Sequence, residues 1–275
     1  MRLLDKFSVI IVVYNPNLKY LNETIDYVIS NGINLILVDN SSCDNPLFHN
    51  EGINYIPLKQ NFGIAYAINI GIKNAFLNNY DKILLLDQDS ILDNQYLDIL
   101  NNVEFSDDSI FLSSHFDRNS LFEFKPVSIN KLGFKKSNND DISFSMSTGT
   151  FFSKGIIDKV GYFNENLFID YVDTEWFLRA KSINVKLIQI KRLRILHQLG
   201  EDYFNLIMFK IFIHNPFRLY YRVRNLNILL FEKHIPFFYV LIEHFKAFIY
   251  LIFIFFFSSK RMKYLKFYFR SFKFN

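Results

Sequence analysis

The sequence predicts an α/β fold, with a mostly parallel central sheet flanked by helices, and two observations carry this prediction. Short, β-branched apolar segments alternate with helically spaced apolar residues between residues 7 and 87. Polar residues gather where each apolar segment ends. Strands linked by helices run parallel through right-handed crossovers, so we expect ligands to bind beyond their carboxyl ends.

The first strand is expected at residues 7–13, where the run FSVIIVV is typical of a strand covered on both faces. A stripe of apolar residues at helical spacing follows and stops at Asn31-Gly32, a pair that favours a helix end. The members of this stripe are Leu18, Leu21, Ile25, Val28 and Ile29.

The second strand is expected at residues 35–39. A weaker third strand is expected at residues 54–58, where Pro57 suits only a sheet edge or a strand end. The fourth strand is the apolar run at residues 82–86, which leads into Asp87. The helical stripe between the third and fourth strands consists of Ala65, Ile68, Ile72, Ala75 and Phe76.

Polar clusters follow all four predicted strands. They are Tyr14-Asn15-Pro16, Asp39-Asn40-Ser41-Ser42, Gln60-Asn61-Phe62-Gly63 and Asp87-Gln88-Asp89-Ser90. Each cluster alone could be an ordinary turn, but four at equivalent positions favour one binding crevice. The sequence has neither a Gly-x-Gly-x-x-Gly after the first strand nor a P-loop, so two common nucleotide-binding classes lose their main support.

Asp87 and Asp89 predict a metal site at this crevice. Two carboxylates at alternate positions after a buried strand offer the hard oxygen ligands that suit Mg²⁺ or Mn²⁺. These ions commonly keep water and substrate phosphates as their remaining ligands. Because no glycine-rich cradle is present, we expect a divalent ion on Asp89 to neutralise a bound diphosphate.

Five segments carry a resemblance to a known family. In order they are SVIIVVYNP (8–16), VDNSS (38–42), NFGIA (61–65), LDQDS (86–90) and DYVDTEWFLRA (170–180). Together they resemble the successive motifs of the family-two inverting glycosyltransferases with a GT-A fold. The last two segments most resemble bacterial rhamnosyltransferases, and related galactosyl- or galactofuranosyltransferases, of surface polysaccharide assembly.

The resemblance implies a site for a nucleotide-diphosphate sugar. Asp39 would read the nucleotide base, Asn61 and Gly63 would line the nucleotide crevice, and Asp87 would hold the ribose or the metal. The implied metal ligands are Asp87, Asp89 and His197, and the remaining implied nucleotide contacts are Tyr14, Asn15, Ser41 and Gln88. A single histidine beside an apolar run is otherwise commonly a packed or surface residue, so both interpretations of His197 stay open.

The resemblance also implies a catalytic base and an acceptor site. Asp173, at the start of a predicted helix, would deprotonate the acceptor hydroxyl, since a helix N-terminus keeps a carboxylate ionised. Glu175 is a rival base, and Asp170 could contact the acceptor or cap the helix. Gly149, in a small-residue strand segment, and Trp176 would lie beside the acceptor with Asp170 and Glu175. Gly149 could equally mark a strand bulge.

Charge divides the chain at residue 202. Residues 1–202 carry 19 Lys+Arg and 25 Asp+Glu, whereas residues 203–275 carry 12 and 2. We therefore expect a GT-A catalytic domain over residues 1–202 and a basic, aromatic-rich helical region over residues 203–275. The single cysteine, Cys43, allows no internal disulfide, and the first strand begins too early to leave room for a cleavable signal peptide.

The C-terminal region contains two apolar runs, residues 203–213 and 247–257. The second has eleven residues, short of the ~20 needed to span a bilayer. We expect interfacial helices whose basic residues face anionic headgroups, namely Lys260, Arg261, Lys263, Lys266, Arg270 and Lys273. A re-entrant hairpin, a core helix with a solvated tail, and a homodimer contact remain alternatives. Nucleic acid is not expected, because long apolar runs interrupt the basic residues.

The predicted function is metal-dependent inverting transfer of a sugar, with rhamnose favoured, from a nucleotide-diphosphate donor to a lipid-linked saccharide. The enzyme would lie peripherally or monotopically on the cytoplasmic face of the cell membrane. The alternatives are a galactosyl- or galactofuranosyltransferase, a sugar nucleotidyltransferase and a membrane-bound scaffold. A nucleotidyltransferase usually has a glycine-rich basic loop after its first strand, which Tyr14-Asn15-Pro16-Asn17 does not resemble.

Overall fold

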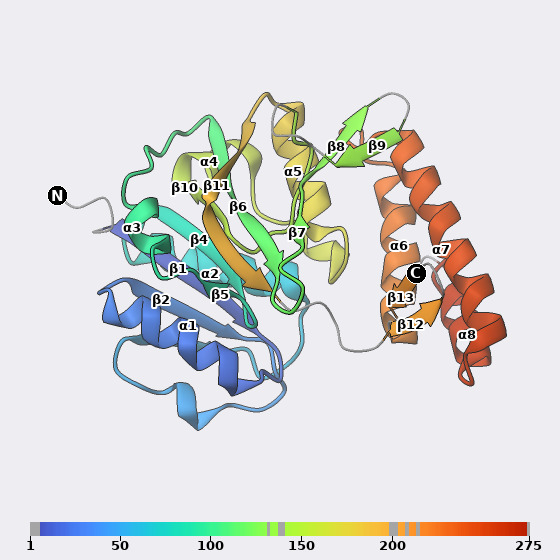
Figure 1. Cartoon of the computed structure of the whole chain (residues 1–275), viewed down its shortest axis with the longest axis horizontal. Coiled ribbons are helices and arrows are strands. Elements are labelled where there is room, and N and C mark those ends of the chain that lie inside the picture. Colours follow the sequence, from blue (N-terminus) through green and yellow to red (C-terminus); the bar gives the residue numbers. More distant parts are fainter. Residues whose placement is uncertain are drawn as a thin grey trace.

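The computed structural model of the chain describes residues 6–130, 133–136, 141–197, 203–206, 209–212 and 215–273 (Figure 1). A mixed nine-stranded sheet lies at its centre, in the order β3-β2-β1-β4-β10-β6-β11-β5, with β7 paired to β6. Helices cover both faces of this sheet, and three further helices stand beside it (Figure 1).

One half of the sheet consists of the four predicted parallel strands. They are β1 (Phe7–Val13), β2 (Asn34–Asp39), β3 (Ile53–Pro57) and β4 (Lys82–Asp87). Pro57 ends β3 at the edge of the sheet, where a missing backbone N–H does least harm. The polar residues after these strands therefore share one edge, as predicted.

The other half of the sheet mixes directions. β10 (Thr150–Ser153) lies antiparallel between β4 and β6 (Ser109–Asp117), and β11 (Lys186–His197) runs parallel to β6. The short strands β5 (Ile91–Leu92) and β7 (Glu123–Phe124) pair antiparallel with β11 and β6. β11 ends at His197 next to Asp117, so it delivers that histidine to the same edge as Asp87.

Two apolar cores fill the spaces between the sheet and its helices. Val9 and Ile11 of β1 pack with α1 (Leu18–Ser30) and α3 (Tyr96–Leu100), whereas Ile10 and Val12 pack on the opposite face. The helices on that opposite face are α2 (Ile64–Leu77), α4 (Lys154–Val160) and α5 (Val172–Ser182). Two 3₁₀ turns, η2 (Pro46–Phe48) and η3 (Glu165–Leu167), lie in the connections.

The C-terminal region is only partly helical. β12 (Tyr203–Leu206) and β13 (Phe209–Phe212) form an antiparallel pair, which differs from the helix expected for the first apolar run. Tyr203 and Phe204 are aromatic residues of the kind enriched in strands, and so short an apolar run does not by itself distinguish a strand from a helix. The helical expectation is met further on by α6 (Pro216–Leu229), α7 (Phe237–Phe257) and α8 (Arg261–Arg270).

These three helices pack against each other and against the α/β part of the chain. Leu219, Val223, Ala247, Leu251, Ile254 and Tyr264 form a cluster of their own. Leu226, Tyr239 and Val240, however, belong to the same core as the sheet residues Ile10 and Ile36. The small hairpin of β8 (Val127–Asn130) and β9 (Gly133–Lys136) also contacts α7, through β9. Packing is thus continuous across the expected boundary at residue 202.

α7 is long and apolar enough, by length and composition, to cross a membrane. Only 28% of its most apolar stretch is buried within the protein. It is the only such helix among the residues that the structure describes. Its inward face carries Tyr239, Val240, Glu243, Ala247, Leu251 and Ile254, and most of its exposed residues are phenylalanine, leucine or isoleucine.

Candidate active site

A cleft of about 600 Å³ opens where β1 and β4 end. Six of the residues predicted to bind the donor line this cleft, namely Tyr14, Asn61, Gly63, Asp87, Gln88 and Asp89. Phe168 and Ile169 form another part of its wall, and Phe217 and Arg218 of α6 complete it. The sheet edge therefore brings together polar residues that are more than seventy positions apart in the chain.

Asp87, Asp89 and His197 converge beside this cleft. One potential ligand atom from each lies within 4.8 Å of the others, and Asp89 Oδ1 is 3.2 Å from His197 Nδ1. Two carboxylates and one imidazole at this separation are a donor set that Mg²⁺ or Mn²⁺ accepts. The residues present therefore fit the divalent ion that the sequence implies.

The electrostatics of the three side chains agree with a cation site. Burial, with smaller contributions from the Asp89 and Asp173 carboxylates, raises the pKa of Asp87 to about 6 against the opposing charge of His197. Burial alone would lower the pKa of His197, but Asp89 and Asp87 outweigh it and raise that pKa. Like charges held this close are stabilised by a positive ion between them.

Two residues that the sequence did not single out hold the metal-site loop in place. The Asp87 N–H donates to Thr148 Oγ1 at 3.0 Å, and Thr148 Oγ1 is 2.7 Å from Ser90 Oγ. Arg118 donates from its guanidinium to the Asp89 carbonyl at 2.8 Å and lies over the ring of Tyr20. Gly149 made this segment a candidate in the sequence, but in the structure it is the Thr148 hydroxyl that contacts the Asp87 N–H.

Gly149 has a different role from the expected one. It adopts a φ of +68°, and a Cβ there would lie 2.5 Å from Ile195 Cδ1 and 2.8 Å from Ser113 Cβ. The close approach that requires glycine is therefore made by β6 and β11 of this chain, not by an acceptor. Its carbonyl accepts from the Ser113 N–H and from the Ser113 hydroxyl. The expected acceptor contact at Gly149 does not fit this packing.

A second, shallower pocket of about 420 Å³ adjoins the ends of β1 and β2 and includes Asn15, Asp39 and Ser41. Asp39 is 1% exposed, and its carboxylate accepts from the Ser41 N–H at 2.9 Å and from the Tyr55 hydroxyl at 2.9 Å. The Asn15 N–H donates to Ser41 Oγ at 2.8 Å. These bonds fix the loop that carries the expected nucleotide contacts.

The Asn61–Gly63 turn is held by side-chain amides. Asn61 Oδ1 accepts from Asn40 Nδ2 and from the Gly63 N–H, each at 3.0 Å. Gly63 has a φ of +91°, and a Cβ there would lie 2.6 Å from the carbonyl oxygen of Phe168. Glycine is therefore required at this position both by conformation and by the close approach of the Phe168 loop.

Asp173 is the second residue of α5 and is half-buried. Its Oδ1 accepts from the Thr174 N–H at 2.8 Å. Burial, aided by the neighbouring Asp170 carboxylate, raises the pKa of Asp173 to about 6 in spite of backbone N–H donors that lower it. At neutral pH such a carboxylate is ionised and is a stronger base than an exposed aspartate, which suits a general base.

The loop before Asp173 is strained and is clamped from α6. Phe168, Asp170 and Tyr171 all have positive φ, at 55°, 63° and 61°, a region that non-glycine residues seldom adopt. The fully buried Asn225 donates from Nδ2 to the carbonyls of Leu167, Ile169 and Asp170 at 2.5, 2.7 and 3.0 Å. The loop that leads to Asp173 is therefore held by a residue more than fifty positions later in the chain.

Asp170 also bonds to α6. The Arg218 guanidinium donates to both of its carboxylate oxygens, at 3.0 to 3.1 Å. This two-point ion pair links the loop before Asp173 to a basic residue that lines the cleft of about 600 Å³. Asp170, which the sequence predicted to contact the acceptor, also lines a pocket of about 340 Å³ beside α7.

The acceptor roles expected of Glu175 and Trp176 do not fit the structure. Trp176 is fully buried and donates from Nε1 to the Gly161 carbonyl at 2.9 Å. Glu175 is 2% exposed and is paired with Arg179 at 2.8 Å and with His234 at 2.9 Å. Both side chains face the core side of α5, so neither can contact an acceptor, and the rival base loses its support.

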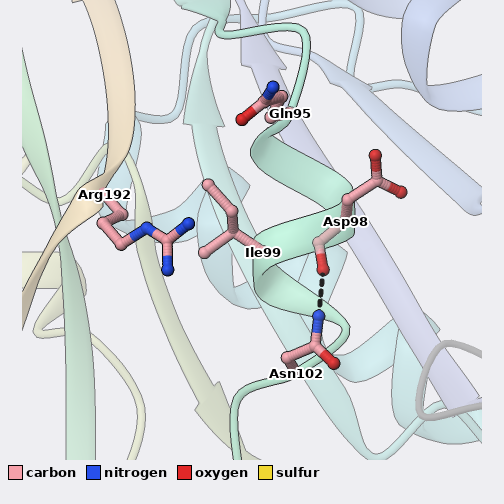
Figure 2. A pocket seen from close by; sticks show the side chains of 5 residues that line it. All are labelled: Gln95, Asp98, Ile99, Asn102 and Arg192. Atoms are coloured by element: carbon pink, nitrogen blue, oxygen red, sulfur yellow. Dashed lines mark hydrogen bonds between the residues drawn. The ribbon is translucent and has the colours of Figure 1, made fainter.

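A further surface pocket of about 400 Å³ lies away from these residues, between α3 and β11 (Figure 2). Gln95, Asp98, Ile99 and Asn102 come from the α3 region, and Arg192 comes from the irregular part of β11 (Figure 2). Asn102 donates to the Asp98 carbonyl at 2.7 Å. No metal-ligand cluster or predicted site residue lies here among the described residues.

Comparisons with known proteins identify the family. Residues 8–161 match Glycosyl transferase family 2. The dTDP-rhamnosyl transferase RfbF of Shigella flexneri is 33% identical over 238 residues, which are 82% of this chain and 80% of that protein. The chain therefore belongs to glycosyl transferase family 2 and is a glycosyltransferase.

Solved structures show the same GT-A fold. S. aureus TarS 1–349 in complex with UDP-GlcNAc matches 95% of this chain and 79% of its own length, with a TM-score of 0.56 and 17% identity. GalNAc-T7 with UDP, GalNAc and Mn²⁺ matches 71% of this chain with a TM-score of 0.56 and 13% identity. The chain spans 43% of that structure and 40% of a longer TarS structure.

Proposed function

We propose that this chain transfers rhamnose, with inversion, from dTDP-rhamnose to a hydroxyl of a lipid-linked saccharide in surface polysaccharide assembly. The donor follows from the 33% identity to a dTDP-rhamnosyl transferase over 80% of its length. The observation that carries the chemistry is the cleft that joins Asp87, Asp89 and Phe168 at one sheet edge, next to the loop that presents Asp173.

The donor would lie along the edge formed by β2, β1 and β4. The pocket around Asp39 and Ser41 suits the nucleoside, since its loop is fixed by the Tyr55 and Asn15 hydrogen bonds. The diphosphate would lie in the larger cleft beside Asp89. Asp87, Asp89 and His197 would hold Mg²⁺ or Mn²⁺, which supplies positive charge to the diphosphate leaving group.

Asp173 would act as the general base. Inversion requires the acceptor oxygen to attack the anomeric carbon from the face opposite the diphosphate, so the base must lie across the sugar from Asp89. Asp173 accepts the hydroxyl proton as the new glycosidic bond forms and the bond to the diphosphate breaks. Its raised pKa supports this role, because a carboxylate with a pKa of about 6 holds a transferred proton better than an ordinary aspartate.

We also propose that the outward face of α7 lies in the membrane interface. Its exposed aromatic residues include Phe237, Phe238, Phe245 and Phe256, at 57%, 68%, 64% and 72% exposure. Basic residues on and beside α8 would meet anionic headgroups. Such a placement suits a lipid-linked acceptor on the cytoplasmic face of the membrane.

A donor panel tests the proposed function. Purified protein with Mg²⁺ or Mn²⁺ is incubated with dTDP-rhamnose, UDP-galactose, UDP-galactofuranose and UDP-GlcNAc, and nucleotide release and melting temperature are measured. We expect dTDP-rhamnose to give the largest melting shift and the fastest release, both lost in chelator. Preference for a UDP-sugar would replace the rhamnosyl assignment. Release of pyrophosphate from dTTP with a sugar 1-phosphate would indicate a nucleotidyltransferase instead.

A further inference from the structure

The cavity of about 340 Å³ that Asp170 lines is bounded by the loop before the proposed base Asp173 and by α6 and α7. That loop, residues 168–171, is the base loop. Its walls include three aromatic side chains and three charged ones, namely Phe144, Tyr171, Tyr239, Arg222, Glu243 and Lys246. Phe144 follows the β8–β9 hairpin, Tyr171 belongs to the base loop, Arg222 lies on α6, and the remaining three lie on α7. None of these six residues was expected to belong to a site.

Glu243 is the unusual member of this group. It is a carboxylate near the middle of the most apolar helix of the protein, and it is only 8% exposed. Its Oε2 accepts from the Tyr171 hydroxyl at 2.9 Å, and its Oε1 accepts from Lys246 Nζ at 2.8 Å. Burying a carboxylate costs several kcal/mol unless it is paired. A helix that served only to contact lipid would have no use for this group.

The cavity adjoins the base. Phe168 and Ile169 line the donor cleft, whereas Asp170, Tyr171 and Thr174 line this cavity. Asp173 lies between two of these cavity residues in the chain. Burial and, to a smaller extent, the Asp173 carboxylate raise the pKa of Tyr239, which also lines the cavity. One short segment of the chain therefore lines both the donor cleft and this cavity and includes Asp173.

The charges of the cavity are balanced. Among the lining residues, the two carboxylates of Asp170 and Glu243 accompany the two basic groups of Arg222 and Lys246, and Asp170 is also bonded to Arg218 outside the cavity lining. Aromatic rings can pack on the apolar C–H faces of a sugar ring, and paired charged groups supply donors and acceptors for its hydroxyls. A phosphate would meet the two carboxylates as well as the two cations. The lining thus favours a neutral saccharide over an anionic ligand.

We propose that this cavity binds the sugar of the acceptor, with its attacking hydroxyl directed at Asp173. This inference rests on the proposed glycosyltransfer and adds the acceptor site to it. Because α7 supplies Tyr239, Glu243 and Lys246 to the cavity and turns its phenylalanines outward, a lipid attached to the sugar can leave along that helix. α7 would then contact both the sugar and the lipid of one acceptor molecule.

The experiment compares Lys246→Trp, which would fill the cavity from its open edge, with Lys233→Trp, at an exposed lysine in the turn between α6 and α7. Lys246 is 47% exposed, so the larger side chain can be accommodated without disturbing the core. Glu243→Gln provides a second variant that keeps the shape of the side chain. The acceptor probe is a lipid extract from a strain that lacks this protein, with radiolabelled dTDP-rhamnose as donor. Nucleotide release in the absence of extract measures reaction of the donor with water.

We expect Lys246→Trp to lower the ratio of transfer to donor hydrolysis by tenfold or more and Glu243→Gln to lower it several-fold. Lys233→Trp should leave both that ratio and the melting temperature unchanged. Because Lys246→Trp and Glu243→Gln alter the pairing of a buried carboxylate, both are assayed below their own melting transitions. An unchanged ratio in well-folded Lys246→Trp and Glu243→Gln would overturn the acceptor site. Absence of dTDP-rhamnose hydrolysis and transfer in the wild type would instead overturn the proposed function.

Discussion

The proposed active site has two parts, which are constructed differently. The donor side is the row of residues at the strand ends, and the base side is the loop and helix start that present the proposed base Asp173. On the donor side, Tyr14, Asp39 and Asp87 stand directly at the ends of adjacent parallel strands, so the register of the sheet fixes their positions. On the base side, Asp173 follows a loop with three left-handed residues that contacts from α6 and α7 hold in place. The donor side depends on local sequence, whereas the base side depends on residues 48 to 72 positions away.

The strongest test of the donor side removes a metal ligand. We expect Asp89→Ala to abolish the metal dependence of donor binding and to lower transfer by about 10²–10³-fold, the scale on which one electrostatic group at a reacting centre acts. Asp26→Ala, an exposed carboxylate on α1, is the control and should behave as the wild type. Full activity of the Asp89 variant, or of the wild type in excess chelator, would remove the metal from the reaction.

The matching test of the base side is Asp173→Asn. Turnover should fall by about 10²-fold or more, while donor affinity stays near that of the wild type, because the variant loses only the proton acceptor. Kinetics with saturating donor, together with donor binding by melting shift, separate the two effects. Glu175→Gln should instead lower the melting temperature, since it breaks a buried pairing with Arg179 and His234. The opposite pattern would move the base to Glu175.

The pH dependence of turnover tests the same residue. The carboxyl of Asp173 must be ionised to accept a proton, and its pKa is raised to about 6. Turnover should therefore fall as the pH drops through 6, approaching tenfold per unit below it, and should be level above about pH 7. Asp87 also has a pKa of about 6, so the donor is kept saturating and Asp173→Asn is measured in parallel. A dependence that persists in Asp173→Asn would belong to another group.

The membrane-facing surface of α7 is tested by Phe245→Ser with Phe256→Ser. Each phenylalanine is largely exposed in the protein, so its removal should weaken binding to anionic vesicles without unfolding the chain. Burial of one such ring is worth about 1.5–3 kcal/mol, so we expect a loss of roughly tenfold or more per residue. High salt should weaken binding only in part. Phe122→Ser, exposed near β7, is the control, and wild-type protein that stays in the supernatant would refute the placement.

The smallest effect is expected where α6 holds the base loop. Asn225→Ala leaves the carbonyls of Leu167, Ile169 and Asp170 without their buried donor, at a cost of about 1–3 kcal/mol. We expect a lower melting temperature and a several-fold loss of turnover. Asn227→Ala, which removes a buried bond to the Ser271 carbonyl, should lower the melting temperature alone. Equal losses of turnover in both would mean that Asn225 acts only on stability.

The contrast between the two sides also explains what the sequence could predict. Strand runs and their polar ends identified β1 to β4, α1, α2 and the convergence of Asp87 with Asp89. Burial on both faces leaves a continuous apolar run in a strand, and burial of one helix face leaves a stripe at helical spacing. Nothing local shows that β10 inserts antiparallel beside β4, since pairing partners are set by the whole sheet.

The errors of prediction cluster on the base side. Trp176 and Glu175 lie beside Asp173 in sequence, yet the helix turns them inward, and the Glu175–Arg179 spacing of four residues was the available sign of a structural ion pair. Asn225, Glu243 and Arg222 were not predicted as site residues, because the identity of a polar residue in a helix does not reveal its partner in another element. Tyr203–Leu206 and Phe209–Phe212 pair as strands where helix was expected, because short apolar runs do not distinguish a strand from a helix.

The contact between Gly63 and Phe168 limits how this enzyme can change over evolutionary time. The wall of the donor cleft and the loop that leads to the base touch so closely that a single added carbon at Gly63 would collide with backbone. A lineage that adopts a larger sugar cannot make room there without displacing the base. New donor preferences must therefore arise elsewhere on the rim of the cleft, for example at the exposed side chains of Tyr14 and Phe217, whereas Arg218 is held by its ion pair with Asp170.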